Sequence, residues 1–339
     1  MARALDTMTP FGSILDVAGI GVGHHQRTGA GWQTGTSVVT VKLGATPGVD
    51  VRGGGPGTRE TDALGPENLV RTIHAVTLTG GSAFGLGAAD GVMAVLEAED
   101  LGFPVGSGVV PVVPAAVIFD LGRGGRFANR PDAAFGSRAA RAALAGRRVP
   151  EWGSVGAGTG ARAGGLQGGV GTASATVQVG DATVVVGALA VVNAVGSVID
   201  TSTGLPWERS GLNVKRPSVP QRRAIVDAMQ HQGPALNTTI GVVATSAQLD
   251  KSEASKLASV AHDGLARAIR PAHGMTDGDT IFTLATGDVA LPNDPAERIA
   301  SLNALLAAAA NTFAAACTHA IVAATTIGDA RAWRDLVEG

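Results

Sequence analysis

The sequence predicts one α+β domain that spans residues 1–339, and three observations support this class. Short runs rich in Val, Ile and Thr lie between Gly-rich turns, which is typical of strands. Segments with helical periodicity follow several of these runs and fill much of the last third of the chain. No internal repeat and no low-complexity linker divides the chain into independent parts.

Eight segments are predicted as strands because β-branched residues alternate or cluster in them between turn residues. They comprise residues 14–22, 35–41, 74–79, 109–118, 172–179, 183–195, 238–247 and 281–285. Pro111 and Pro114 make the fourth an edge strand or a bent strand. Gly180-Asp181-Ala182 predicts a hairpin turn between the fifth and the sixth.

Five segments are predicted as helical, and the fifth is either one long helix or a helix pair. They comprise residues 86–99, 132–145, 222–230, 250–269 and 299–328, and an amphipathic tail follows at residues 329–337. Ser82 is expected to cap the first, while Asp132 lies in the first turn of the second and Gly146 ends it. In the fourth, Asp250 to Glu253 form the start signal. The face expected to be buried holds Leu257, Val260, Ala261, His262, Asp263, Gly264, Leu265 and Ala268.

Two stretches lack regular periodicity. Residues 49–64 contain four Gly around Pro56 and then a polar cluster, so they are either a solvated loop or a site of substrate contact or assembly. Residues 200–235 are polar and rich in turns, which indicates an exposed linker in which a chain cut would be tolerated.

Composition excludes some classes of partner. The net charge is -2, which provides no electrostatic footprint for nucleic acid or an anionic membrane. Only 16% of residues are charged, against about 25% in a typical soluble domain, so we expect a homo-oligomer that covers part of its surface. The N-terminus has no apolar core of signal-peptide length, so a cytoplasmic protein is expected.

Residues 299–328 form a long segment without charged residues. Their Ala, Asn and Thr content nevertheless favours a helix in a protein core over a membrane span.

No cofactor or metal is expected. The segments 80–85 and 156–160 imitate dinucleotide-binding turns, but no Gly-Lys-Ser/Thr follows, and no acidic residue closes a second strand. Asp277 and Asp279 precede a strand, where they either cap the turn or hold an ammonium group or a metal. The EF-hand pattern fails there because a bidentate Glu is missing. Cys317 lies in an Ala-rich run without metal-ligand neighbours, which indicates a buried, inert thiol.

The dipeptide Asn237-Thr238 stands at the start of an apolar strand. If the bond between the two residues were cut, Thr238 would become a new N-terminus whose amine could activate its own hydroxyl group. The alternative is that Asn-Thr only opens the strand. Asn193, in another apolar run, is either a structural turn residue or a donor that polarises a carbonyl oxygen.

The order of these motifs resembles one family, the self-processing L-aminopeptidase/D-esterases, which also contain β-aminopeptidases and nylon-oligomer hydrolases. The segments that carry the resemblance are residues 51–54, 78–86, 155–160, 191–193, 236–245, 261–269 and 275–282. They span nearly the whole chain.

This resemblance implies a four-layer αββα sandwich similar to the N-terminal-nucleophile hydrolases. It implies a cut before Thr238 that leaves chains of residues 1–237 and 238–339, which stay associated and assemble further, commonly as four αβ units. Thr238 would attack a small peptide or amide substrate, Asn193 and backbone N–H groups would stabilise the oxyanion, and Asp277 and Asp279 would be polar partners of the nucleophile. The substrate site is expected to include Gly81, Ser82, Phe119 and Gly158.

Two positions depart from relatives. Phe119 stands where relatives can carry Tyr, and Gly165 stands where some nylon hydrolases have Lys, with Arg162 and Gln167 nearby. These differences argue against a nylon-oligomer substrate, although they leave the nucleophile in place.

The preferred hypothesis is therefore an autoprocessed aminopeptidase or amidase that acts on short peptides, amino-acid amides or esters. An endo-amidase for nylon-type oligoamides is one alternative. A non-catalytic oligomer that binds small molecules through its glycine loops is another, and a nucleotide-dependent oxidoreductase is the weakest.

Overall fold

Strand β2 (Trp32–Val51) connects the two halves of the fold because its two ends pair with different neighbours. Its first half pairs with β1 (Ile20–Gly29) and β4 (Ile73–Thr79), and its last residues pair with β15 (Thr280–Val289). The register shifts between Thr40 and Ala45, where β2 passes from one half to the other. The resulting nine-stranded sheet has the order β10-β11-β14-β15-β2-β4-β7-β3, with β1 paired to β2.

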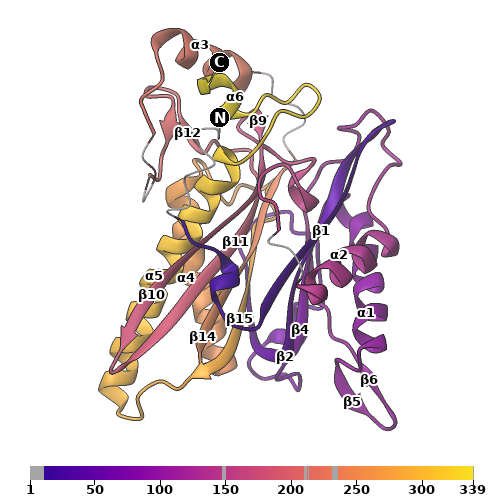
Figure 1. Ribbon diagram of the computed structural model, residues 1–339, viewed down its shortest axis with the longest axis vertical. Helices are drawn as coiled ribbons and strands as arrows, with labels where there is room; N and C mark the ends of the chain where they lie inside the picture. The colour runs from indigo at the N-terminus through magenta and orange to yellow at the C-terminus, as the bar shows by residue number, and fades with distance from the viewer. Residues whose placement is uncertain (1–10, 147–149, 210–211, 213, 231–235, 339) are drawn as a thin grey trace.

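The chain forms four layers, as the computed structural model shows for residues 11–146, 150–209, 212, 214–230 and 236–338 (Figure 1). Helices α4 (Lys251–Ala268) and α5 (Pro295–Val322) cover one half of the sheet, and α1 (Ala88–Ala98) and α2 (Ala133–Ala145) cover the other. The remaining strands of the main sheet are β3 (Thr58–Arg59), β7 (Ala115–Val117), β10 (Gly169–Val179), β11 (Ala182–Asn193) and β14 (Thr238–Ala247). The predicted αββα sandwich is confirmed.

Smaller elements complete the fold. They are the 3-10 turns η1 (Ile14–Asp16), η2 (Asp62–Leu64), η3 (Ser82–Gly87) and η4 (Gly156–Gly158), the helices α3 (Val219–Met229) and α6 (Trp333–Glu338), and the strand pairs β5 (Phe103–Val105) with β6 (Gly108–Val110), β8 (Arg162–Ala163) with β9 (Leu166–Gln167), and β12 (Ile199–Asp200) with β13 (Leu205–Pro206).

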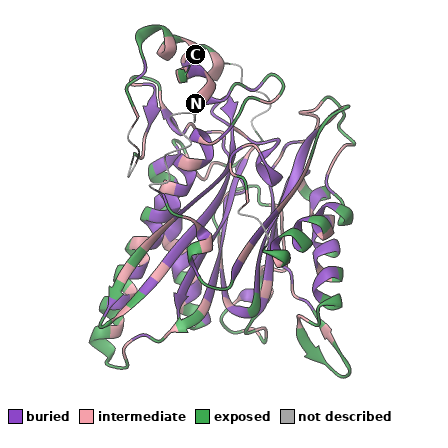
Figure 2. Cartoon of the chain, in the orientation of Figure 1, coloured by how far each residue is buried: buried purple, intermediate pink, exposed green. Residues whose placement is uncertain are grey.

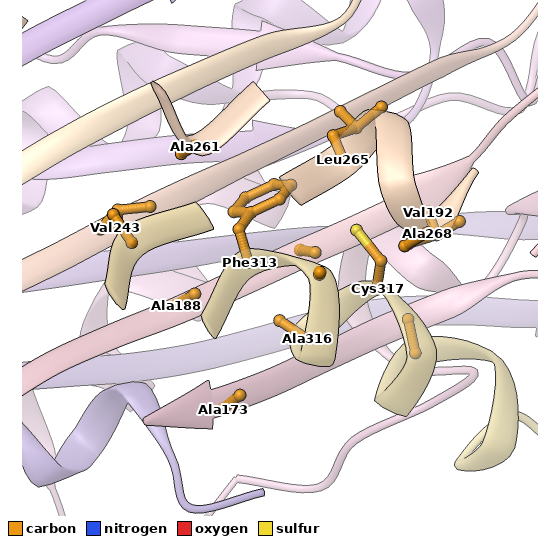
Figure 3. Close-up of a cluster of buried hydrophobic side chains, with 14 of the residues drawn as sticks. Ala173, Ala188, Val192, Val243, Ala261, Leu265, Ala268, Phe313, Ala316 and Cys317 are labelled. Carbon is orange, nitrogen blue, oxygen red and sulfur yellow. The ribbon is translucent and has the colours of Figure 1, made fainter. Parts of the chain in front are cut away.

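Three apolar cores separate the four layers. Alternation along β11 assigns its side chains to two of them, because successive side chains of a strand point to opposite faces. Val192 faces α4 and α5, where it lies in one cluster with Val243, Leu265, Phe313 and Cys317 (Figure 3). Leu189 and Val191 face the other half of the sheet and pack with Leu78, Ile240 and Phe282. The third core joins α1 and α2 to β2 and β4 through Val38, Ala75, Val92, Leu96 and Ala139. In Figure 2 the central strands are largely buried, and exposed residues lie on the outer faces of the helices, in loops and along the β5–β6 hairpin.

Helix α5 is one continuous helix of 28 residues, not a helix pair. It is long and apolar enough to cross a membrane, but 78% of its most apolar window is buried inside the structure. Cys317 lies on its buried face, as predicted, and burial raises the pKa of the thiol. Both observations identify α5 as a core helix.

Several local predictions are wrong, each for a specific reason. Residues 14–16 form a 3-10 turn because Ser13 and Asp16 satisfy one another's backbone N–H groups, so the strand begins only at Ile20. The run 109–118 is split, because Pro111 and Pro114 separate β6 from β7. The first residues of the predicted loop 49–64 continue β2, where they pair with β15.

Two side chains and one segment also differ from expectation. Ser82 makes no capping hydrogen bond. Gly81 occupies the N-cap position instead, and Ser82 itself has a φ of 51°. Asp263 is exposed because it lies about 200° around the helix from the buried Ala261. The segment 200–235 is not simply an exposed linker, because Leu205 and Ile225 pack into the core. Its residues 210–211, 213 and 231–235 lie outside the described residues.

Candidate active site

Thr238 is the first residue of β14, and strand pairing sets its neighbours. In the antiparallel ladder with β11 it lies opposite Asn193, the last residue of that strand. On the other side β14 runs parallel to β15, so the turn Asp277-Gly278-Asp279 that leads into β15 lies level with the start of β14. The Thr238 side chain is 5% exposed. Three sequence segments predicted to contribute to the site therefore meet around one hydroxyl group.

The Thr238 hydroxyl group donates a hydrogen bond to the carbonyl oxygen of Asn237. The hydroxyl oxygen therefore lies beside the carbonyl group of the bond that a cut before Thr238 would break.

Asp279 holds the start of β14 in place. One of its carboxylate oxygens accepts the N–H of Thr239 at 2.7 Å. The other accepts the backbone N–H of His273 at 3.0 Å and lies 2.9 Å from Nδ1 of the same histidine. Both oxygens thus have partners, so Asp279 anchors the backbone next to the hydroxyl group and orients His273.

Asp277 is buried beside Asp279. It accepts the N–H of Gly274 at 3.1 Å, and its backbone carbonyl accepts the N–H of Gly55 at 2.8 Å. Burial and the neighbouring charge of Asp279 raise the pKa of the Asp277 carboxyl group.

Asn193 is fully buried, and its amide group is fixed by three contacts. Its Oδ1 accepts from the guanidinium group of Arg123 and from the N–H of Arg162, the latter at 3.0 Å. Its Nδ2 donates to the carbonyl oxygen of Phe119 at 3.4 Å. Because only a carbonyl oxygen accepts two N–H groups, these contacts assign Oδ1 and Nδ2 without ambiguity.

Arg123 was not predicted as a site residue, yet it links both asparagines of the site. Its Nη2 donates to Oδ1 of Asn237 at 3.0 Å, and its Nη1 donates to Asn193 and to the carbonyl oxygen of Gly160. Burial lowers the pKa of Arg123 to about 10, and the negative charge of Asp120 partly offsets this. Arg123 remains a cation at neutral pH.

Asp120 is the buried acid next to Arg123. Its carboxylate accepts the hydroxyl group of Thr34 at 2.6 Å and the N–H of Gly81 at 2.7 Å. Burial raises the pKa of Asp120 to about 6, although both hydrogen bonds and the charge of Arg123 favour its ionised form. Gly81 thus helps to fix the acid that faces Arg123.

A pocket of about 220 Å³ opens beside Thr238. It is lined by residues 55–57, 82–83, 236–238, Val117, Phe119 and Thr276. No charged side chain lines it among the described residues. The pocket therefore suits an uncharged group next to the Thr238 hydroxyl group.

The structure brings most of the residues predicted for the site together. Thr238, Asn237, Asn193, Asp277 and Asp279 lie around the peptide bond between Asn237 and Thr238, as described above. Ser82 and Phe119 line the pocket. Gly81 does not line it and instead binds Asp120. Gly158 is not brought to the pocket either, because it packs against the backbone of Val170 and Gly153.

The position of Gly165 has a conformational explanation. Gly165 has a φ of 88°, and a Cβ atom there would lie 2.5 Å from the carbonyl oxygen of Met229. A longer residue is therefore excluded at this position without a rearrangement. Of its polar neighbours, Gln167 is buried and donates to nearby carbonyl groups, and Arg162 forms an ion pair with Asp329.

His273 was also missed, together with Arg123 and Asp120. All three belong to irregular segments, where sequence periodicity gives no information on side-chain direction. The only available signal was that His273 and Asp120 adjoin motifs already singled out. Among the described residues, no group of three or more His, Cys, Asp or Glu side chains is arranged to hold a metal ion.

Comparisons with known proteins agree with this geometry. The model of peptidase family S58 matches residues 12–333. An uncharacterised aminopeptidase of Mycobacterium tuberculosis is 48% identical over 345 residues, which cover 96% of this chain and 98% of that protein. The 6-aminohexanoate-oligomer endohydrolase of a Kocuria species is 30% identical over 290 residues, which cover 83% of this chain and 77% of that protein.

Two solved structures share the fold. A β-aminopeptidase of a Burkholderia species superposes with a TM-score of 0.67 at 23% identity, and the match covers 97% of this chain and 94% of that one. The L-aminopeptidase D-Ala-esterase/amidase of Ochrobactrum anthropi, described as a variant of the Ntn hydrolase fold, has a TM-score of 0.68 at 21% identity. This second match covers 94% of this chain and 88% of that one.

Proposed function

Because the chain belongs to peptidase family S58 and is a hydrolase, we propose that it is a self-processing aminopeptidase or amidase whose nucleophile is Thr238. The observation that carries this proposal is the hydrogen bond that the Thr238 hydroxyl group donates to the carbonyl oxygen of Asn237. It forms at the start of a buried strand. The nucleophile and the bond that must be cut to free its amine are thus adjacent.

The self-cut follows from this arrangement. Thr238 Oγ1 attacks the carbonyl carbon of Asn237, the C–N bond breaks, and the hydroxyl proton passes to the departing amine nitrogen of Thr238. The product is an ester between Asn237 and the Thr238 side chain. Water then hydrolyses this ester and leaves a carboxylate on Asn237 and a free α-amine on Thr238. The resulting chains comprise residues 1–237 and 238–339.

Turnover uses the same hydroxyl group. The freed amine accepts the hydroxyl proton as Thr238 attacks the substrate carbonyl group, and then returns the proton to the leaving amine. The Nδ2 group of Asn193 donates to the oxyanion. Asp279 anchors Thr239 and so fixes the direction of the nucleophile. Water deacylates the enzyme in the second half of the cycle.

The substrate class follows from the pocket and from the relatives. The uncharged lining favours short peptides, amino-acid amides or esters with small neutral side chains. The 30% identity to an oligomer endohydrolase motivates a second candidate, an endo-amidase acting on 6-aminohexanoate oligomers. The exposed Phe103, Val105 and Val110 of the β5–β6 hairpin support assembly into a homo-oligomer of αβ units, with a tetramer favoured.

The experiment compares wild-type protein with Thr238→Ala and with Thr238→Ser, which keeps a hydroxyl group. On a denaturing gel, wild type and Thr238→Ser should each separate into two bands. N-terminal sequencing of the shorter wild-type chain should give Thr238 first and Thr239 second. Thr238→Ala should remain one band and should not hydrolyse amino-acid p-nitroanilides. A single wild-type band with full activity would refute the proposal. A panel that includes 6-aminohexanoate oligomers separates the two substrate classes.

A further inference from the structure

The side chain of Arg123 binds the side chains of two asparagines beside the proposed nucleophile. It contacts Asn237, whose carbonyl carbon is attacked in the proposed self-cut, and Asn193, which lies opposite Thr238 in the sheet. Arg123 itself lies in the irregular segment after β7, with no place in a helix or strand. One guanidinium group therefore connects the residues on both sides of the nucleophile.

The contact with Asn193 determines which way its amide group faces. Arg123 and the N–H of Arg162 both donate to Oδ1, so Nδ2 must lie on the opposite side. One Nδ2 hydrogen is directed to the carbonyl oxygen of Phe119, the acceptor identified within the described residues, and the second is available for an oxyanion. Without Arg123, the amide group would keep only the Arg162 N–H at 3.0 Å and the longer contact with Phe119 at 3.4 Å to oppose its rotation.

The contact with Asn237 acts on the self-cut. Nη2 of Arg123 holds the Asn237 side chain at 3.0 Å, while the Asn237 backbone N–H donates to the carbonyl oxygen of Thr276 at 3.3 Å. Together these two contacts restrict the rotation of the residue whose carbonyl group Thr238 attacks. Restricting the reacting atoms to one geometry is a large part of the rate of an intramolecular reaction.

The chemistry of the side chain suits this double contact. A guanidinium group is planar and presents several N–H donors in a fixed fork, so it can hold two acceptors on different segments at once. A lysine ammonium group carries the charge on a single nitrogen atom and cannot reproduce that fork. The buried carboxylate of Asp120, which is fixed by Thr34 and Gly81, faces Arg123 and compensates its charge.

We propose that Arg123 is a positioning residue for both steps of the proposed function: it aligns Asn237 for the self-cut and orients Asn193 for turnover. This inference rests on the proposed function. It assigns to Arg123 no contact with the substrate and no proton transfer.

The test uses Arg123→Ala and Arg123→Lys in the full chain, with Arg126→Ala as the matched control, because Arg126 is an exposed arginine three residues further along. The rate of the cut is followed on denaturing gels. kcat and KM are measured per Thr238 N-terminus. Since a hydrogen bond to a charged group contributes about 1.5–3 kcal/mol, Arg123→Ala should slow the cut and lower kcat by about 10- to 100-fold each. KM should change by less than about twofold, because Arg123 does not line the pocket.

Added guanidinium ion at millimolar concentration separates a positioning role of Arg123 from a purely structural one, because it should raise the rates of Arg123→Ala only if Arg123 positions the asparagines. It should restore part of the cut rate and of kcat in Arg123→Ala and should have no effect on Arg126→Ala. Arg123→Lys should remain impaired in both steps, because its charge is retained and the fork is lost. Wild-type rates in Arg123→Ala, or a loss in Arg123→Ala that guanidinium leaves unchanged, would overturn the proposal.

Asn237→Ala keeps the inference testable if Arg123→Ala is insoluble. It removes one partner of Arg123, so the cut should slow; only the cut rate is read in this variant, because Asn237 also lines the pocket. An unchanged cut rate in Asn237→Ala would overturn the role of Arg123 in the cut. Wild-type protein separates this inference from the proposed function. If wild type is not cut before Thr238, the proposed function fails. If wild type and Arg123→Ala are cut equally fast, only the positioning role fails.

Discussion

Gly278 lies level with Thr238, the proposed nucleophile, and adding one methyl group there tests the geometry of the site directly. A Cβ atom on Gly278 would lie 2.9 Å from Thr238 Oγ1, 2.9 Å from the carbonyl oxygen of Gly55 and 3.1 Å from Cα of Pro56. Two of these neighbours are backbone atoms, which yield less readily than a side chain. Gly278→Ala is therefore expected to displace the Thr238 hydroxyl group.

The size of the effect follows from the distances. Ordinary contacts of a Cβ atom begin near 3.4 Å, so the Thr238 oxygen must retreat by about half an ångström. A displacement of about 1 Å costs about 100-fold in rate at an active site, so about half of that displacement should slow the self-cut roughly tenfold. Inserting the methyl group into a packed site should also cost about 1–3 kcal/mol of folding free energy.

Cell-free translation stopped at intervals, followed by a denaturing gel, measures the rate of the cut. Gly55→Ala is the matched comparison, since a Cβ atom there has no neighbour closer than 3.5 Å. Because the added methyl group of Gly55→Ala enters the pocket, turnover of substrate is not compared in this variant. Its cut rate should equal that of wild type. If Gly278→Ala is cut as fast as Gly55→Ala, the Thr238 hydroxyl group is not the nucleophile of the cut.

Three further predictions concern stability and reactivity. Burial lowers the pKa of His262 to about 4, so the unfolded state binds its proton first and stability falls as pH drops from 6.5 towards 4. The contribution of His262 is at most about 3 kcal/mol. His262→Gln should reduce the fall of Tm across this range without abolishing it, because burial also lowers the pKa of His24 to about 4. Phe313→Ala should lower the free energy of unfolding, measured with denaturant, by about 3–5 kcal/mol, because the ring is fully buried. Phe127 is 58% exposed, so Phe127→Ala should change this free energy by less than about 0.5 kcal/mol. Cys317 should not react with a thiol reagent until the protein is unfolded, and reaction of the native protein would contradict its burial.

Elements set by near neighbours in the sequence were predicted closely. The strand 238–247 has the predicted bounds, and the hairpin between β10 and β11 turns at Gly180 and Asp181. Helix α4 begins at the predicted capping box of Asp250 and Glu253. In each case the deciding interactions lie within a few residues, so the local pattern contains the necessary information.

The site depended on information that local pattern does not contain. Asn193 and Thr238 are 45 positions apart in the sequence and meet only because β11 and β14 pair in one register. The resemblance to a known family implied that the two residues share one site, but it did not predict the pairing of the strands. Arg123 was not found, because it belongs to a Gly-rich segment that also contains Arg126 and Arg130. Only the folded structure distinguishes the arginine that reaches Asn237 from the two that do not.

The strand order also bears on how the two proposed chains would stay together. A cut before Thr238 assigns β14 and β15 to the shorter chain, and these strands lie side by side in the middle of the sheet. β14 pairs with β11 from Val186↔Thr245 to Asn193↔Thr238, and β15 pairs with β2 from Thr280↔Val51 to Ala285↔Thr46. The shorter chain is thus hydrogen-bonded to the longer one along both edges, and α4 and α5 cover the same half of the sheet. Separation would break two ladders and expose the core around Phe313, so a self-cut frees the Thr238 amine at little cost to the fold.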